Sequence, residues 1–435
     1  MVHQLKKLIP APWFQYYHLF LAYLAAWRYA NPSNELIVIG VTGTNGKSTT
    51  VMMIARMLED AGFRVGATST ALFKIGEREW LNNQKMTMLG RFQLQKMLRA
   101  MVNAKCQYAV IETSSQGIEQ FRHIGINFDV AVFTNLTPEH IEAHGGFENY
   151  KKAKLKLFKK ISTDTHKYIG GEKIEKTIIA NRDSDHADDF LNFSVDEKIT
   201  FSINSESDIK AEDIIADKEG ISFVVDNQQV DLQLFGRFNI YNALAVLAVA
   251  ESQDIDLPIA AEALARIETM PGRFEFVTHE PFAVLVDYAY EPEGLRQCYQ
   301  AIKDHQLVAP GHKLIHLLGS CGGGRDVARR PILGQMAGET AQIVIVTNED
   351  PYDDNPEEII TNVAKGAIDA GKIINQNLFT ITDRREAIAK AFSLAQSGDL
   401  VLLTGKGSEQ VICVAGGKKI KWDERQVARE LLSKK

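Results

Sequence analysis

The residues from Gly40 to Thr50 read Gly-Val-Thr-Gly-Thr-Asn-Gly-Lys-Ser-Thr-Thr and combine glycines with one lysine and several hydroxyls. In such a loop, backbone N–H groups turn toward phosphate oxygens, the lysine reaches the terminal phosphates, and a hydroxyl ligates Mg²⁺. Lys47 and Ser48 stand at those two positions. The spacing between Gly40 and Gly46 is one residue longer than in the general pattern. The segment predicts binding of a nucleoside triphosphate, and a glycine-rich turn without a ligand is the alternative.

The segments on either side of this loop have the patterns of a buried strand and a helix. Residues Glu35–Ile39 are mostly apolar and β-branched, which is typical of a strand inside a parallel sheet. Apolar residues then recur at helical spacing, at Val51, Ile54, Met57 and Leu58. Gly62 stands where a helix commonly ends. A strand, a loop and a helix in this order favour nucleotide binding.

Acidic and imidazole side chains follow two other predicted strands. Glu112 comes directly after Tyr108–Ile111, and His140 follows the strand Phe128–Phe133. Because parallel strands end at one edge of their sheet, Glu112 can hold the Mg²⁺ that Ser48 contacts. Each residue alone also fits a structural role, Glu112 as a solvated or capping carboxylate and His140 as a packed or surface histidine.

Three further segments carry polar groups. The segment Tyr150–Phe158 contains several lysines, which without context indicate the exposed face of a helix. Asn239 and Asn242 follow Gly236 at the start of a predicted helix, where amides suit an adenine edge or a phosphate. Arg273 lies at a predicted domain junction, from which a guanidinium can reach phosphate across a cleft.

Composition limits the class of protein. The 435 residues are 45% hydrophobic and 24% charged, which is typical of a globular protein of two or three domains. A net charge of −6 offers no basic face for nucleic acid, so we expect no nucleic-acid partner. Cys106, Cys298, Cys321 and Cys413 are too scattered for a disulfide framework or a zinc site. We expect a cytoplasmic monomer.

The first 35 residues form a segment of their own. Lys6 and Lys7 precede an aromatic-rich stretch, Trp13–Trp27, without the pattern of a signal peptide. This stretch is shorter than the roughly 20 residues that cross a bilayer, so we expect no stable membrane insertion. A helix packed on the next domain is the expected structure, and peripheral membrane contact is the alternative.

The rest of the chain predicts two α/β domains. Residues 36–275 alternate strands and helices as a central parallel-sheet ATPase domain does, with a small antiparallel β subregion at about 195–235. Residues 276–435 predict a C-terminal Rossmann-like domain. Its expected strands are Ala283–Val286, Leu314–Leu318, Ile343–Val346 and Leu400–Leu403.

Several motifs in one order resemble the Mur ligase family, most closely its tripeptide-forming, MurE-type members. They cover about residues 36–435 and are Gly43–Ser48, Glu112–Ser115, Thr134–Thr137 with His140, Tyr150–Lys154, Gly236–Asn239 with Asn242, Gly272–Glu275, Asp287–Ala289 and Gly405–Glu409.

The resemblance implies cofactors and residue roles. It implies ATP, two Mg²⁺ ions and a carbamate on Lys154, which turns a cation into a metal-binding anion. The implied nucleotide contacts are Gly43, Thr44, Asn45, Gly46, Lys47, Ser48, Thr49, Asn239, Asn242, Arg273, Asp287 and Arg325. The implied metal ligands are Ser48, Glu112, His140 and Lys154, and the implied catalytic residues are Lys47, Glu112, His140, Lys154 and Arg273. Thr87, Ser114 and Arg122 fall where the family holds its muramoyl peptide nucleotide, and Asp350, Tyr352, Gly405 and Glu409 where it holds the amino acid.

Two departures bear on the substrates. The family carries a uridine-binding domain before the phosphate loop, whereas about 35 residues precede the first strand here; we expect the Trp13–Trp27 helix to replace it, or an acceptor recognised without UDP, or a different acceptor. The family motif Asp-Asn-Pro-Arg aligns with Glu349–Tyr352. Because tyrosine cannot fork onto a carboxylate as arginine does, we expect a diamino acid such as lysine, or diaminopimelate held in another way.

The resemblance implies an ATP-dependent amide ligase that activates a carboxylate as an acyl phosphate and adds an amino acid to a UDP-N-acetylmuramoyl-dipeptide-like acceptor in peptidoglycan precursor synthesis. Two alternatives stay open. One is another ligase of the same superfamily, of the folylpolyglutamate, cyanophycin or poly-γ-glutamate type. The other is a non-catalytic nucleotide-binding partner subunit.

Overall fold

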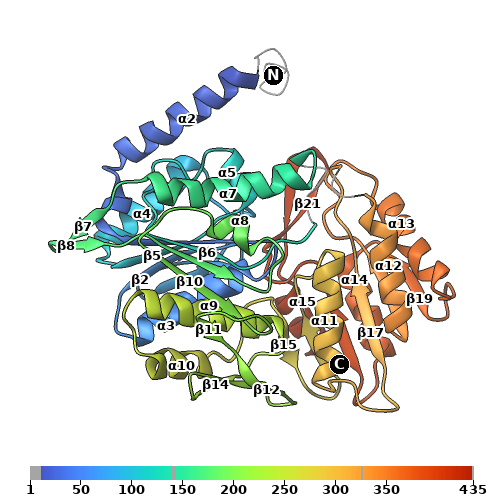
Figure 1. Ribbon diagram of the computed structural model, residues 1–435. Coiled ribbons are helices and arrows are strands. Elements are labelled where there is room, and N and C mark those ends of the chain that lie inside the picture. The colour runs from blue at the N-terminus through green and yellow to red at the C-terminus, as the bar shows by residue number, and fades with distance from the viewer. Residues whose placement is uncertain (1–10, 139–143, 325–326, 434–435) are drawn as a thin grey trace.

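The computed structural model describes residues 11–138, 144–324 and 327–433. Figure 1 shows two α/β bodies side by side, the first built from the blue to yellow-green part of the chain and the second from the orange and red part. A helix, α2, extends from the first body.

A nine-stranded sheet forms the centre of the first body, in the order β11-β10-β9-β6-β1-β5-β2-β3-β4. Its strands are β1 (Ile37–Thr42), β2 (Val65–Thr68), β3 (Leu72–Ile75), β4 (Arg78–Leu81), β5 (Tyr108–Glu112), β6 (Val130–Phe133), β9 (Thr177–Asn181), β10 (Glu197–Ser202) and β11 (Ile209–Lys210). Only β3 and β4 run antiparallel to their neighbours. β1 pairs with β5 on one side and β6 on the other, so the loop after β1 lies at a switch point, where open parallel sheets place their ligands.

Helices cover both faces of this sheet. They are α3 (Lys47–Asp60), α4 (Arg91–Asn103), α5 (Ser115–Glu119), α7 (Phe147–Thr163), α8 (Ala187–Leu191), α9 (Phe238–Ser252) and α10 (Leu257–Ala265). Successive residues of β1 alternate between two cores, Ile39 with α3 and α9 on one face and Val38 with α4 and α7 on the other. The short elements η1 (Pro32–Glu35), β7 (Lys167–Ile169) and β8 (Glu172–Ile174) lie at the periphery.

The small β subregion is smaller than predicted. Only β12 (Glu212–Ala216), β13 (Ile221–Val225) and β14 (Gln228–Leu232) form a separate antiparallel sheet. β10 also falls in the 195–235 stretch, but it pairs in parallel with β9 of the main sheet. Ile199 and Phe201 of β10 pack in the core beside α9. Apolar and polar residues therefore alternate along β10 as they do in a half-exposed antiparallel strand, so periodicity does not distinguish the two kinds of strand.

The second body is a six-stranded sheet in the order β15-β16-β20-β17-β18-β19, parallel except for β15. Its strands are β15 (Glu275–Thr278), β16 (Ala283–Val286), β17 (Leu314–Leu318), β18 (Ile343–Thr347), β19 (Leu378–Ile381) and β20 (Leu400–Leu403), and β21 (Val411–Val414) and β22 (Lys418–Lys421) form a hairpin. Its helices are α11 (Pro292–Asp304), α12 (Arg329–Thr340), α13 (Pro356–Asp369), α14 (Arg384–Leu394) and α15 (Glu424–Leu432), with η2 at Ala415–Gly417. The predicted fold class, two α/β bodies with a small β subregion, is confirmed.

The N-terminal helix α2 (Ala11–Arg28) contains the predicted Trp13–Trp27 segment. Its C-terminal half packs beside α4 through alanines. Among the described helices, none combines the length and apolar character needed to span a bilayer.

Candidate active site

The loop between β1 and α3 has the geometry of an anion cradle. Gly46 has φ +83°, and a Cβ there would collide with the amide oxygen of Asn242, so only glycine fits. No side chain caps α3. The first bond within the helix runs from Thr50 N to Gly46 O, which leaves the N–H groups of Lys47, Ser48 and Thr49 directed at the loop, as phosphate oxygens require.

The segment after β6 holds this loop in shape. Asn135 receives hydrogen bonds from the backbone N–H groups of Thr44 (2.9 Å) and Asn45 (2.8 Å), through its carbonyl and its side-chain oxygen respectively. The Thr134 hydroxyl donates to Asn45 O at 2.8 Å. Asn135 was not among the predicted site residues, although it lies inside a motif that the sequence singled out.

Glu112, at the end of β5, is 2% exposed and accepts three hydrogen bonds. The Ser48 hydroxyl donates to Oε2 at 2.8 Å and Thr70 N donates to the same oxygen at 2.6 Å. The Thr70 hydroxyl donates to Oε1 at 3.1 Å. The structure thus brings together two of the four side chains predicted to hold Mg²⁺, the Ser48 hydroxyl and the Glu112 carboxylate, which are oxygen ligands of the kind that Mg²⁺ prefers. These residues fit the ion.

Lys154 points inward from α7 and is 1% exposed. Its Nζ donates to Gly43 O at 2.6 Å and lies 4.5 Å from the centroid of the Tyr150 ring. Lys47 Nζ donates to Thr44 O at 2.6 Å, so both ammonium groups lie against the phosphate loop. The basic segment is therefore not a uniformly exposed helix face. His140 lies outside the described residues.

Asn239 and Asn242 form a hydrogen-bonded chain at the start of α9. Thr50 Oγ1 donates to Asn242 Oδ1 at 3.1 Å, Asn242 Nδ2 donates to Asn239 Oδ1 at 2.9 Å, and Asn239 Nδ2 donates to Phe235 O at 2.8 Å. These amides join α9 to α3 directly behind the phosphate loop.

The second body closes over the same loop. Asn45 Nδ2 donates to Glu291 Oε1 at 3.2 Å, which links the loop to the residue that caps α11. Arg273 lies over the Tyr288 ring, 4.1 Å from its centroid. Asp287 accepts N–H bonds from Phe274 and Ala289, both at 2.7 Å. Arg325 lies outside the described residues.

A cavity of about 190 Å³ collects these groups from both bodies. The predicted residues that line it are Thr44, Asn45, Gly46, Lys47, Ser48, Thr49, Thr87, Glu112, Ser114, Lys154, Asn239, Asn242, Arg273 and Asp287. Gly43 contributes its carbonyl to Lys154 behind the loop.

A second cavity of about 560 Å³ adjoins the first, and the residues that line both are Thr70, Thr87, Ser114, Ser115, Tyr288 and Tyr290. All the predicted substrate residues line this second cavity: Thr87, Ser114, Arg122, Asp350, Tyr352, Gly405 and Glu409. The shared residues make the two cavities neighbours.

On its central-body side, the second cavity carries hydroxyls and one guanidinium. Thr87 Oγ1 lies within hydrogen-bonding distance of Thr70 Oγ1, at 3.0 Å, and Ser114 Oγ caps α5 by accepting from Gly117 N at 3.2 Å. Arg122 donates to Met88 O and, at 2.6 Å, to Gln120 Oε1. Burial, together with the nearby Arg91, lowers the pKa of Arg122, so an anionic ligand would relieve an electrostatic cost there.

Two lysines that were not among the predicted site residues balance the charge of the carboxylates on the other side of this cavity. Lys406 is fully buried and donates to Asp350 Oδ2 at 3.1 Å and to Glu409 Oε2 at 2.6 Å. Lys85 comes from the first body, pairs with Asp350, and lies 3.2 Å from Glu409 Oε2. Burial alone would lower the pKa of Lys85, but Glu409 and Asp350 outweigh it and raise that pKa.

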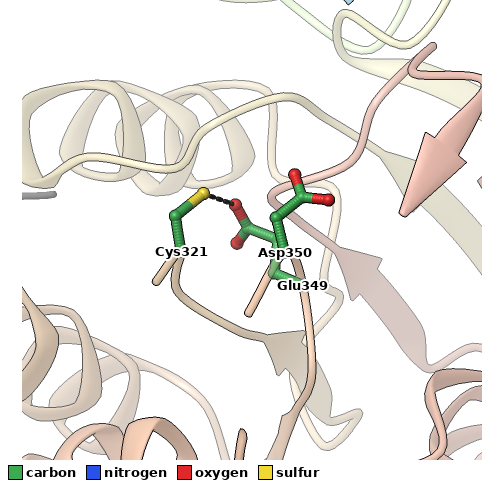
Figure 2. A group of neighbouring side chains, drawn as sticks. All are labelled: Cys321, Glu349 and Asp350. Carbon is green, nitrogen blue, oxygen red and sulfur yellow. Dashed lines mark hydrogen bonds between the residues drawn. The ribbon is translucent and has the colours of Figure 1, made fainter. Parts of the chain in front are cut away.

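Cys321, Glu349 and Asp350 all line this cavity, and Figure 2 shows their side chains close together. The Cys321 thiol donates to Glu349 Oε1 at 3.0 Å. Burial raises the pKa of both groups, and the Asp350 carboxylate already faces the ammonium groups of Lys85 and Lys406. We therefore assign these residues no metal ion.

Comparison with known proteins agrees with this arrangement. The model of the Mur ligase middle domain matches residues 41–250, and that of the Mur ligase, glutamate ligase domain matches residues 272–407. The UDP-N-acetylmuramyl-tripeptide synthetase of Roseiflexus sp. (strain RS-1) is 37% identical over 422 residues, which are 95% of this chain and 82% of the relative. A UDP-N-acetylmuramoyl-L-alanyl-D-glutamate--2,6-diaminopimelate ligase of Syntrophomonas wolfei is 36% identical and covers 95% of this chain and 81% of the relative.

Solved structures show the same fold. A UDP-N-acetylmuramoyl-L-alanyl-D-glutamate--2,6-diaminopimelate ligase superposes with a TM-score of 0.60 at 29% identity, covering 92% of this chain and 78% of the other. Mycobacterium tuberculosis folylpolyglutamate synthase reaches 0.67 at 18% identity, covering 89% and 92%. From the two domain matches and the identity with full-length relatives, this chain belongs to the Mur ligase family, whose members are ATP-dependent amide ligases.

Proposed function

We propose that this chain adds an amino acid, a diamino acid, to a UDP-N-acetylmuramoyl-dipeptide-like acceptor in peptidoglycan precursor synthesis. The observation that carries the proposal is the pair of adjoining cavities. The first cavity is lined by the phosphate loop and Glu112. The second is lined by hydroxyls and Arg122 on one side and by the carboxylates of Asp350 and Glu409 on the other. An acceptor carboxylate at their junction would face the phosphates on one side and the incoming amine on the other.

ATP would supply the phosphoryl group that activates the acceptor carboxylate as an acyl phosphate, and the amine would then displace phosphate. Lys47 and the free N–H groups at the start of α3 would hold phosphate oxygens. Ser48 and Glu112 would orient the metal. Arg273, held flat on Tyr288, would offset charge that develops on the transferred group. Contacts between the bodies, such as Asn45 with Glu291, would exclude water from the acyl phosphate.

Lys154 would act as a carbamate that helps hold a second Mg²⁺. The proposal is supported by the burial of Lys154 against the phosphate loop, where the unmodified ammonium contacts Gly43 O and the Tyr150 ring. A carbamate there would be an anion close to phosphate anions, so a bound Mg²⁺ would be needed to balance the negative charge.

The amino acid would lie near Asp350, Tyr352, Gly405 and Glu409. Tyr352 cannot make the two parallel hydrogen bonds that an arginine makes to a second carboxylate, which favours a diamino acid such as lysine, or diaminopimelate held in another way. We place the domain limits at 1–35, 36–275 and 276–435, and we expect a monomer that acts in the cytoplasm.

Mass spectrometry of the products tests the function. The protein is incubated with ATP, Mg²⁺, UDP-N-acetylmuramoyl-L-alanyl-D-glutamate and a mixture of amino acids. We expect one new mass, equal to the acceptor plus one amino acid minus water, with phosphate released in equal amount. Phosphate release without a new mass would exclude this acceptor. If neither phosphate nor a new mass appears, the chain has no ligase activity on this acceptor.

A further inference from the structure

The solvent-facing side of α2 is a row of aromatic rings. Tyr16, Phe20, Tyr23 and Trp27 are 71%, 63%, 58% and 72% exposed. Their spacing of four, three and four residues places them on one helical face, and Tyr17, 56% exposed, lies beside them. The opposite face carries the buried alanines of the helix, Ala22, Ala25 and Ala26.

This aromatic face carries no charge along its whole length. From Ala11 to Trp27 the helix contains no Asp, Glu, Lys or Arg, its one histidine, His18, is half-buried, and the exposed Arg28 ends the helix. Tyrosine and tryptophan combine an apolar ring with a polar group, so they favour the boundary between water and lipid headgroups. A contiguous exposed row of such rings marks a contact surface.

A row of lysines lies on α7, on the same side of the molecule. Lys152, Lys156 and Lys159 are exposed, and their spacing of four and three residues places them on one face. Lys154 points the opposite way, into the phosphate-loop site. None of the three outer lysines forms an ion pair with a carboxylate in the part of the chain that the structure describes.

The segment between α5 and β6 connects the two features. Gly125 packs on Ala22 and Ala26 of α2. Two residues earlier, burial together with the charges of Lys160 and Lys156 lowers the pKa of His123 to about 3. The base of α2 and the lysine face of α7 therefore flank one short segment, and Figure 1 shows both helices on the same side of the first body.

We propose that the aromatic face of α2 and the outer lysines of α7 together bind the surface of a membrane that contains anionic lipids. The rings would enter the headgroup layer, and the lysines would face the negative lipid charge. Helix α2 would lie in the interface without crossing the bilayer. A membrane fits better than a second copy of this chain paired through these two helices, because α2 carries no acidic side chain that could meet the lysine row.

Vesicle flotation with the whole chain tests this proposal. The probes are vesicles of phosphatidylcholine alone and of phosphatidylcholine mixed with phosphatidylglycerol. The first variant combines Lys152→Glu, Lys156→Glu and Lys159→Glu, and the second combines Tyr16→Ser, Phe20→Ser and Tyr23→Ser. Exposed lysines of β22 supply the matched control, Lys418→Glu with Lys419→Glu and Lys421→Glu.

We expect the wild-type chain and the β22 control to float with the mixed vesicles, and flotation to fall at high salt because salt screens surface charge. The α7 and α2 variants should bind the mixed vesicles about tenfold or more weakly, with unchanged thermal melting. Absence of flotation with mixed vesicles would overturn the proposal, as would equal loss in the β22 control. A doubled mass in light scattering that only the α2 variant abolishes, without flotation, would instead assign the aromatic face to a second copy.

Discussion

Replacing Glu112 by glutamine should separate its structural role from its proposed metal role. The carboxylate is buried and accepts from Ser48 Oγ and Thr70 N on one oxygen and from Thr70 Oγ1 on the other. If the glutamine oxygen takes the place of Oε2, the bonds from Ser48 Oγ and Thr70 N are kept. The amide nitrogen then takes the place of Oε1 and donates to Thr70 Oγ1, and the Thr70 hydroxyl proton turns to Thr87 Oγ1, 3.0 Å away. The variant loses a charge but no hydrogen-bonding partner.

The expected magnitudes follow from this geometry. Glu112→Gln should change the free energy of unfolding by less than about 1 kcal/mol, because every donor keeps an acceptor. Glu112→Ala should cost about 1–3 kcal/mol for each donor left without an acceptor, the Thr70 N–H and the Ser48 hydroxyl. For the metal, exchanging a carboxylate for a neutral amide should raise the half-saturating Mg²⁺ concentration about tenfold or more, which is roughly 1.4 kcal/mol.

Thermal melting and magnesium titration of ATP-dependent phosphate release measure the two effects separately. A titration of ADP binding with excess chelator controls for the phosphate loop, which the glutamine should leave intact. If Glu112→Gln has the wild-type Mg²⁺ requirement, Glu112 does not hold the ion. If it melts as low as Glu112→Ala, the hydrogen-bond argument is wrong.

Three other predictions concern single titratable side chains. Lys154→Ala should abolish phosphate release, and a short carboxylic acid added to the assay should restore part of it if a carbamate acts there; unchanged turnover would refute that role. Lys85→Met should lower turnover and increase the radius of gyration in X-ray scattering, because Asp350 loses an ion pair that joins the two bodies; wild-type scattering would contradict this. Burial lowers the pKa of His316 to about 3, below the unfolded value of about 6.5, so its contribution is complete above pH 6.5 and is lost as pH falls toward 3. Between pH 7 and 5 this histidine should cost about 2 kcal/mol of unfolding free energy, and His316→Gln should flatten that part of a melting profile against pH.

Local patterns were sufficient for much of the fold and part of the site. The phosphate loop is continuous in the sequence, and its glycines, lysine and hydroxyl act through backbone geometry that a strand and a helix impose locally. Glu112 was predictable because a carboxylate at the end of a parallel strand must lie at the ligand-binding edge. The strand β10 was misplaced because one covered face produces the same alternation in a parallel and in an antiparallel strand.

By itself, the sequence determined that this chain binds nucleotide phosphates on an α/β sheet and which family it resembles. Only the tertiary structure decided the charge balance of the second cavity, because Lys85 and Asp350 stand 265 positions apart and meet through the packing of the two bodies. The same holds for α7, where burial turns Lys154 toward the phosphate loop while its neighbours Lys152 and Lys156 stay in solvent. Periodicity specifies which residues share a face, but the packing of the helix on the sheet selects the face that becomes the site.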